Sequence, residues 1–237
     1  MTISMAKIRQ FGALILFTLV LTGISPVLRA QESWYVQEDR TFYAGVLAGA
    51  NFSQVDGDDF KGYHKIGLNV GGIVYARLDE HLAASLEILF SQKGARGTIT
   101  TPLVANLNGS SIKQTSTMTN YHLDLNYAEV PIMLNYFDKR KSHFGAGFSY
   151  SQLVQSNERF KTDVVLNPPY NQYDYPMKKY DVNLLLSGSL HLWEGLFMNL
   201  RFQYSLLTIR KDVDANLGRP NQQYNNMFVL RLMYLFI

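Results

Sequence analysis

Residues 125–136, LNYAEVPIMLNY, alternate between apolar and polar side chains as an extended strand would. One set of alternate positions holds Ala128, Val130, Ile132, Leu134 and Tyr136. Glu129 and Asn135 belong to the other set, and successive side chains of a strand point to opposite faces. A soluble sheet would bury the apolar set, whereas a membrane barrel turns it toward lipid and places the carboxylate in the lumen. The orientation of this segment therefore decides between two classes of protein.

Seven further segments show the same alternation, which predicts an all-β protein with eight strands. They are residues 42–54, 66–78, 82–93, 144–154, 180–192, 196–209 and 228–236. The connections at 79–81, 138–142 and 193–195 are short, and those at 94–120, 156–179 and 210–225 are long. Short turns on one side and long loops on the other are typical of outer-membrane barrels, with both chain ends on the periplasmic side. Residues 94–120 are expected to be either a loop or an extension of the strands beyond the bilayer.

The alternative fold is a soluble eight-stranded carrier of lipocalin type, which would need the apolar face inside. The polar face of the predicted strands is rich in Gly and Ser and poor in charge, whereas about a quarter to a third of a soluble surface is charged. The chain also carries 14 Phe and 15 Tyr, and outer-membrane barrels place many aromatic residues at the membrane interfaces. The sequence thus favours an antiparallel up-and-down transmembrane β-barrel, whose lumen at eight strands is wide enough only for side chains.

The N-terminal segment has the layout of a secretory signal peptide. Lys7 and Arg9 precede an apolar run from Phe11 to Ile24, which is too short to span a bilayer, and Ala30 is the expected cleavage point. We expect residues 1–30 to be the signal peptide, 31–40 a short periplasmic segment and 41–237 the barrel. Without residues 1–30 the 22 basic residues fall to 19, equal to the 19 acidic ones, so charge gives no indication of a nucleic-acid partner. The absence of cysteine excludes disulfides, thiolate metal sites and a lipoprotein anchor.

Four charges are predicted to face the lumen near the middle of their strands: Glu87, Glu129, Arg201 and Arg231. An unpaired buried charge costs several kcal/mol, and one guanidinium can bind two carboxylates, so we expect a lumenal charge network. A proton or ion path is the functional alternative. Pro131 shares the inward face and cannot donate to the sheet, which predicts a bulge or a lost hydrogen bond there.

Two weaker features bear on partners and on catalysis. The segment 167–176 carries Tyr170, Tyr173 and Tyr175 and could bind a partner through aromatic contacts, although an ordinary solvated loop explains it equally well. His122 and Asp124, beside a Ser/Thr-rich stretch, are the only arrangement resembling a His-acid-Ser set of barrel lipid enzymes. No metal-ligand or cofactor motif is recognisable, so neither a metal nor a cofactor is expected.

Four segments carry a resemblance to a known family: Gly45–Ser53, Leu86–Gly94, Tyr127–Leu134 and Leu200–Leu206. Through them the sequence resembles the family of PorT-type outer-membrane β-barrel proteins. The resemblance implies a Gram-negative outer-membrane location and an association with protein secretion or the assembly of surface proteins. The chain ends Phe236-Ile237, whereas such barrels commonly end on an aromatic residue.

We therefore expect a non-enzymatic barrel with a filled lumen and a structural or interaction role. Its expected partners are outer-membrane lipid, lipopolysaccharide and other outer-membrane or secretion proteins bound through long loops. The alternatives are a small-solute channel and an outer-membrane lipid-modifying enzyme.

Overall fold

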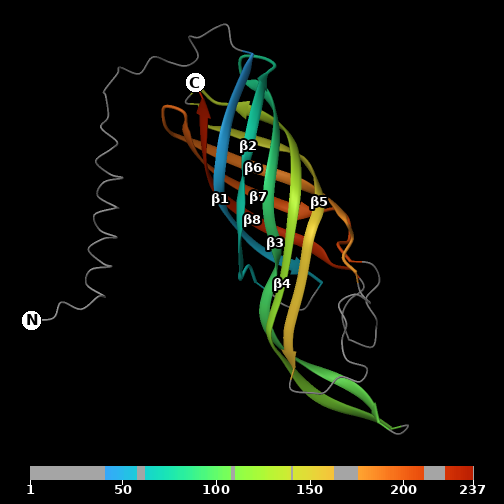
Figure 1. Cartoon of the computed structure of the whole chain (residues 1–237). Helices are drawn as coiled ribbons and strands as arrows, with labels where there is room; N and C mark the ends of the chain where they lie inside the picture. Colours follow the sequence, from blue (N-terminus) through green and yellow to red (C-terminus); the bar gives the residue numbers. More distant parts are fainter. Residues whose placement is uncertain are drawn as a thin grey trace, which may run out of the picture. The chain divides into compact units, whose positions relative to one another are not determined.

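Eight antiparallel strands close into a barrel in the computed structural model of this protein (Figure 1). The structure describes residues 41–57, 62–107, 110–139, 141–162, 176–210 and 222–236. Each strand pairs with its neighbours in the sequence, and β1 pairs with β8 to complete the wall. The strands are β1 (Phe42–Asp56), β2 (Lys65–Arg77), β3 (Leu82–Leu107), β4 (Ser110–Phe137), β5 (His143–Thr162), β6 (Tyr180–Trp193), β7 (Leu196–Ser205) and β8 (Tyr224–Phe236). The predicted eight-stranded antiparallel barrel is confirmed.

The alternation of side chains sets an apolar exterior and places the polar and charged side chains inside, together with buried apolar ones. On β4, Ile132 is 61% exposed and Leu134 50%, whereas Glu129 is 1% exposed. The other strands repeat this arrangement, with Leu, Ile, Val, Phe and Tyr outside and Asn, Ser and charged residues inside. This orientation is the one predicted for a membrane barrel and opposite to that of a soluble carrier.

Inward glycines allow the wall to curve tightly around the lumen. A Cβ added to Gly71 would lie 2.0 Å from the Ile88 carbonyl oxygen, and one added to Gly49 would lie 2.2 Å from that of Leu230. No side chain fits at such distances. A small barrel brings neighbouring strands this close on its concave side, and glycine is the residue that permits it.

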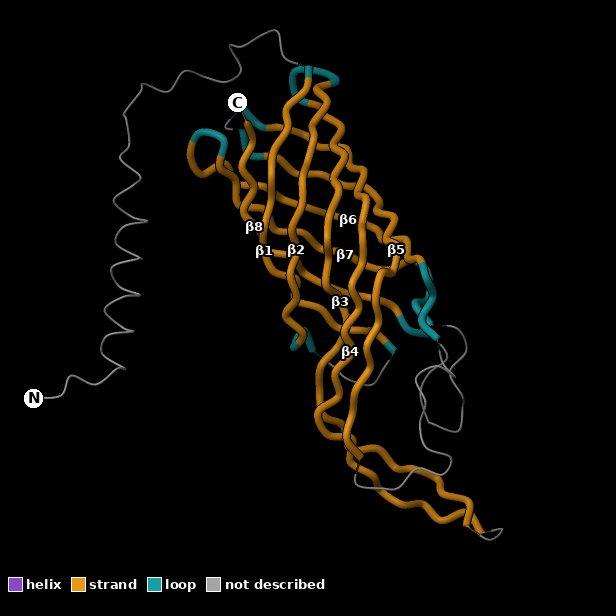
Figure 2. Tube along the Cα trace, viewed as in Figure 1, coloured by secondary structure: helices purple, strands orange, loops and turns teal. Residues whose placement is uncertain are grey.

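Three strands continue well past the wall of the barrel (Figure 1, green to yellow). The segment predicted as either a loop or a strand extension is an extension, because β3 reaches Leu107 and β4 begins at Ser110. Short turns at residues 78–81, 138–142 and 194–195 gather at the opposite end, near the C-terminus of β8 (Figure 2).

Strand β7 is shorter than predicted. It ends at Ser205, whereas the alternation predicts a strand as far as Ile209. Ile209 instead turns inward, where it is 1% exposed and donates its backbone N–H to the Gln223 carbonyl at 2.8 Å. The neighbouring Arg210 pairs with Met177 in an isolated bridge. Burial of the Ile209 side chain explains why the chain leaves the ladder here.

Of the two outcomes predicted at Pro131, the structure shows lost pairing and not a bulge. Pro131 faces inward as expected and pairs in regular register with Ser149 of β5. The β3–β4 ladder is interrupted between Leu86↔Ile132 and Leu89↔Glu129 but resumes in the same register. A proline lacks the N–H that a ladder needs, so the strand loses pairing at this point without gaining a residue. Bulges lie elsewhere, around Thr98 and Val154.

Three predicted parts of the chain lie outside the described residues: the signal peptide 1–30, the segment 31–40, and the loop tyrosines Tyr170, Tyr173 and Tyr175. Within the part that the structure describes, no helix is both long and apolar enough to cross a membrane. That result concerns helices and does not bear on crossing by strands.

Candidate functional site

Aromatic side chains pack across the periplasmic end of the lumen. The His143 ring stacks on Phe137, with centroids 4.3 Å apart, and meets Phe197 edge-on at 5.6 Å. Tyr75 donates its hydroxyl toward Nε2 of His143 at 3.0 Å or accepts from it, depending on the tautomer. Met233 lies 3.7 Å from the same hydroxyl, and all of these side chains are buried. They form one packed layer of buried side chains.

A carboxylate held by two guanidiniums forms the next layer. Arg231 donates from Nη1 to Glu87 Oε2 at 2.9 Å and from Nη2 to Oε1 at 3.1 Å. Arg201 Nη2 also donates to Oε1 of Glu87, at 2.5 Å. Asn199 accepts from Arg231 Nε at 2.8 Å, which fixes the guanidinium plane. The carboxylate comes from β3 and the guanidiniums from β7 and β8, so this group joins opposite walls of the barrel.

A lysine and a second carboxylate form the layer toward the extracellular end. Lys93 Nζ lies 3.1 Å from Glu129 Oε2, and both side chains are 0% exposed. Gln203 donates to the other oxygen of Glu129 at 2.7 Å. Lys93 also donates to Ser151 at 3.2 Å and lies 4.9 Å from the centre of the Tyr127 ring. The ammonium is thus held by an ion pair, a hydroxyl and an aromatic face.

Asp181 brings the lumenal charge to zero. Ser205 and Asn225 donate to its Oδ2 at 2.7 and 3.1 Å. The Glu87 layer has two guanidiniums and one carboxylate, a net charge of +1. The Lys93 layer, with Glu129 and Asp181, has one ammonium and two carboxylates, a net charge of −1. These two layers therefore neutralise each other within the described lumen.

An apolar cluster fills the extracellular end of the lumen. Its members are Val55, Ala95, Tyr121, Leu123, Leu125, Tyr127 and Ile209, with Leu153 and Met177 packed against them. At its edge Glu158 accepts from Arg210 Nη2 at 2.5 Å and from the Tyr121 hydroxyl at 2.9 Å. Side chains thus occupy the described lumen from one end to the other.

The structure brings together three of the four predicted lumenal charges. Arg201 and Arg231 both bind Glu87, whereas Glu129 is paired with Lys93. Lys93 and Asp181 also lie on the inward face of their strands, although the predicted group does not include them. Their position on that face in a narrow barrel was the signal that could have identified them.

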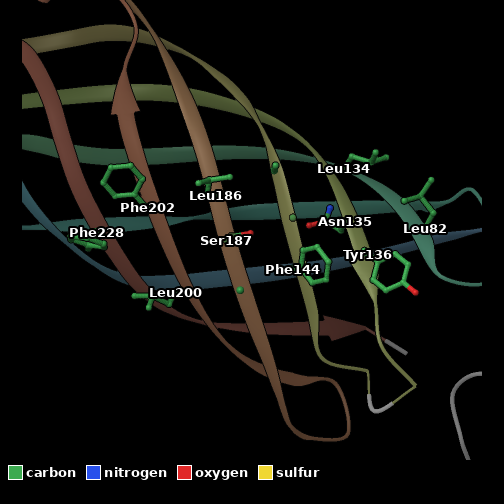
Figure 3. A pocket seen from close by; sticks show the side chains of 13 residues that line it. Leu82, Leu134, Asn135, Tyr136, Phe144, Leu186, Ser187, Leu200, Phe202 and Phe228 are labelled. Carbon is green, nitrogen blue, oxygen red and sulfur yellow. The ribbon is translucent and has the colours of Figure 1, made fainter.

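The lipid-facing wall has an apolar groove across β4 to β8 with a volume of about 770 Å³. Gly188 lies at its floor between Phe144 and Leu200 in the cross-strand register, and an added Cβ would meet nothing within 4 Å. Figure 3 shows Tyr136, Phe144, Leu200 and Phe202 along its sides. The groove offers no charged group, so it suits hydrocarbon rather than a polar substrate.

The Asp124 carboxylate of the predicted His122–Asp124 pair is bound by two basic side chains. Asp124 accepts from Lys65 and, at 3.4 Å, from Arg159. His122 lies directly across the ladder from Arg96 and Arg159. Among the residues described, no cluster of three or more His, Cys, Asp or Glu could hold a metal ion.

Comparisons with known proteins address the family. The model of the family described as the outer membrane protein beta-barrel domain matches residues 30–209. The solved structure of Ail, the attachment invasion locus protein of Yersinia pestis, is similar at 12% identity with a TM-score of 0.40, covering 83% of this chain and 100% of Ail. Ail in complex with the heparin analogue sucrose octasulfate gives 11% identity, the same TM-score and the same coverage. A comparison with curated protein sequences finds no match. The match over most of the chain, together with the closed barrel and its apolar exterior, shows that this chain belongs to the outer membrane protein beta-barrel domain family and is an integral protein of the Gram-negative outer membrane.

Proposed function

We propose that this protein is a non-conducting, non-enzymatic barrel that works through its surface and its strand extension. The observation that carries the proposal is the burial of Lys93 and Glu129, whose side chains are 0% exposed inside a lumen that a channel would have to fill with water. Hydrated pores need wider barrels, because eight strands enclose only enough space for side chains. Residues 1–30 would direct export and be removed.

The proposed role is that of an accessory to protein secretion or to the assembly of surface proteins, as in PorT-type barrels. The extension of β3, β4 and β5 supports it, because these strands continue beyond the barrel wall and offer an additional surface there. The segment with Tyr170, Tyr173 and Tyr175 is a second candidate for contact with a partner protein.

Conductance measurements on the purified full-length barrel in planar lipid bilayers test the sealed lumen. We expect no steady open current. A matched experiment with a larger porin shows that insertion is detectable. Steady single-channel currents from the wild-type protein would contradict the proposal and favour the small-solute channel.

Crosslinking in intact outer membranes tests the interaction role. Deletion of residues 99–118 removes the far part of the β3–β4 extension, and deletion of residues 163–175 removes the tyrosine segment. We expect at least one deletion to abolish a crosslink to another outer-membrane protein while the barrel still folds, as judged by its heat-modifiable mobility. An unchanged set of crosslinks in both deletions would refute the role of these segments.

Analysis of lipid A tests the enzyme alternative. Asp124 binds Lys65 and Arg159 and is not held by His122, which argues against a catalytic pair. We expect identical lipid A in cells with the wild-type protein, His122→Asn and no protein. A modification that depends on His122 would overturn the non-enzymatic proposal.

A further inference from the structure

A row of basic side chains crosses three strands just beyond the apolar exterior of the barrel. Arg96 of β3 pairs in register with His122 of β4, and His122 pairs with Arg159 of β5. Directly opposed residues of a sheet lie on the same face. On β3 and β4 that face is the outward one, because Ile88, Phe90, Val130 and Ile132, at the same alternation, are exposed.

The basic row lies beyond the apolar exterior by a distance that would reach the lipid headgroups and sugars. Arg96 follows the exposed Phe90 by six residues, roughly 20 Å along the strand and about 15 Å along the barrel axis at a typical tilt. A polar row of Gln92, Asn126 and Gln155 separates the two, and Asn126 donates to Gln155 at 3.3 Å. The outward face therefore changes from apolar to polar to basic as it leaves the membrane.

The basic row borders a polar hollow. His64, Arg96, Gly97, Thr98 and His122 line a space of about 400 Å³ between the residues preceding β2 and the strand extension. The pairing of β3, β4 and β5 loses its regular register at this place, with shifts between Gly97 and Ile99 and between Thr119 and His122. Such irregularities often lie beside binding sites, because they redirect side chains and leave backbone groups unpaired.

The hollow keeps an excess of positive charge. Arg96 lines the hollow, and beside it Lys65 and Arg159 both bind the Asp124 carboxylate. Burial alone would raise the pKa of Asp124, but hydrogen bonds and charges from Lys65 and Arg159 hold it below its usual range. Asp124 is therefore ionised and neutralises one of the three cations. Within the described part of the chain, no hydrogen bond or ion pair engages the Arg96 guanidinium.

We propose that Arg96, His122 and Arg159 form a binding site for the phosphate groups of lipopolysaccharide in the outer leaflet. One guanidinium group can donate two parallel hydrogen bonds to two oxygens of the same phosphate. The hollow would lie at the height of the phosphorylated sugars of this lipid, above its hydrocarbon chains. The site depends on the outer-membrane location and is independent of the proposed role in secretion. The absence of a crosslink to a partner protein would therefore not argue against the phosphate site.

Binding to purified full-length barrel in detergent tests the site. The probes are lipopolysaccharide, the same lipopolysaccharide after removal of its phosphates, and inorganic phosphate. We expect the intact lipid to bind, and the double variant Arg96→Gln/Arg159→Gln to weaken binding by about tenfold or more, because each charge-assisted contact is lost. The dephosphorylated lipid should bind wild-type protein as weakly as the intact lipid binds the double variant.

Lys139→Gln is the matched control, since it removes an exposed charge at the opposite, short-turn end of the barrel. It should bind lipopolysaccharide like the wild type. Heat-modifiable mobility verifies that every variant is folded. The proposal is overturned if the double variant binds normally, if removal of the phosphates has no effect, or if inorganic phosphate binds and lipopolysaccharide does not.

Discussion

Arg231 donates two hydrogen bonds across the lumen to the two carboxylate oxygens of Glu87, at 2.9 and 3.1 Å. The two residues lie 144 positions apart in the chain, one on β3 and the other on β8. Because the same carboxylate also accepts from Arg201, one acidic side chain connects three strands. The Glu87 side chain therefore links strands on opposite sides of the lumen, and its loss should lower the free energy of unfolding.

Replacing Glu87 with Gln should destabilise the barrel strongly. The change leaves Arg201 and Arg231 buried beside each other without a carboxylate, and breaking a buried ion pair on one side typically costs 3–5 kcal/mol. Urea unfolding of the barrel refolded in lipid vesicles measures the free energy of unfolding. Glu80→Gln, the same chemical change in an exposed turn, is the control and should have little effect. Equal stability of the two variants would show that the Glu87 contacts contribute nothing.

The pairing of Lys93 with Glu129 should appear as coupling between substitutions. Lys93→Met leaves the Glu129 carboxylate buried and unpaired, and Glu129→Gln leaves the ammonium unpaired, so each alone should lower the unfolding temperature. The double variant removes both charges and should recover much of the loss. A double variant whose destabilisation equals the sum of the single effects would argue against direct pairing.

Alanine at two strand glycines should have opposite outcomes. Gly49→Ala places a Cβ 2.2 Å from the Leu230 carbonyl oxygen and 2.4 Å from the Arg231 Cβ, so we expect a loss of about 1–3 kcal/mol or failure to fold. Gly188→Ala meets no atom within 4 Å and lies on the lipid-facing groove, so stability should be unchanged or slightly raised. Heat-modifiable gel mobility across a temperature series compares the two variants. A tolerated Gly49→Ala would contradict the close approach of β1 and β8.

The charge of Asp124 should persist to low pH. Its pKa is lowered in the folded protein, so the stabilisation it provides is present above the unfolded-state pKa of about 3.9 and is lost as the pH falls through the lower folded value. The side chain is 28% exposed, which limits the effect to a fraction of a kcal/mol. Carbon-13 NMR of the Asp124 carboxyl measures the titration. Lys65→Gln should move the midpoint upward, and Lys139→Gln should leave it in place; the reverse would exclude Lys65 as the cause.

The sequence by itself determined the faces of the strands, because a period of two allows one orientation once one side must meet lipid. The exposure of Ile132 and the burial of Glu129 follow from that period once the apolar face is assigned to lipid. The candidates Glu87, Arg201 and Arg231 followed from the same rule. The alternation mispredicted strand ends where tertiary packing overrides the local sequence pattern. The alternation predicts that β7 continues to Ile209, but this residue packs in the apolar cluster inside the lumen. The alternation also does not predict how far β3 and β4 extend beyond the barrel.

Only the tertiary structure decided which charges meet. Contacts across a lumen depend on the curvature and register of all eight strands. The spacing of residues within one strand therefore does not predict them. Glu129 thus pairs with Lys93 rather than with an arginine, and Asp181 supplies the charge that makes the two lumenal layers neutral. The basic row of Arg96, His122 and Arg159 depends on register in the same way, because these residues are far apart in sequence and adjacent only across the sheet.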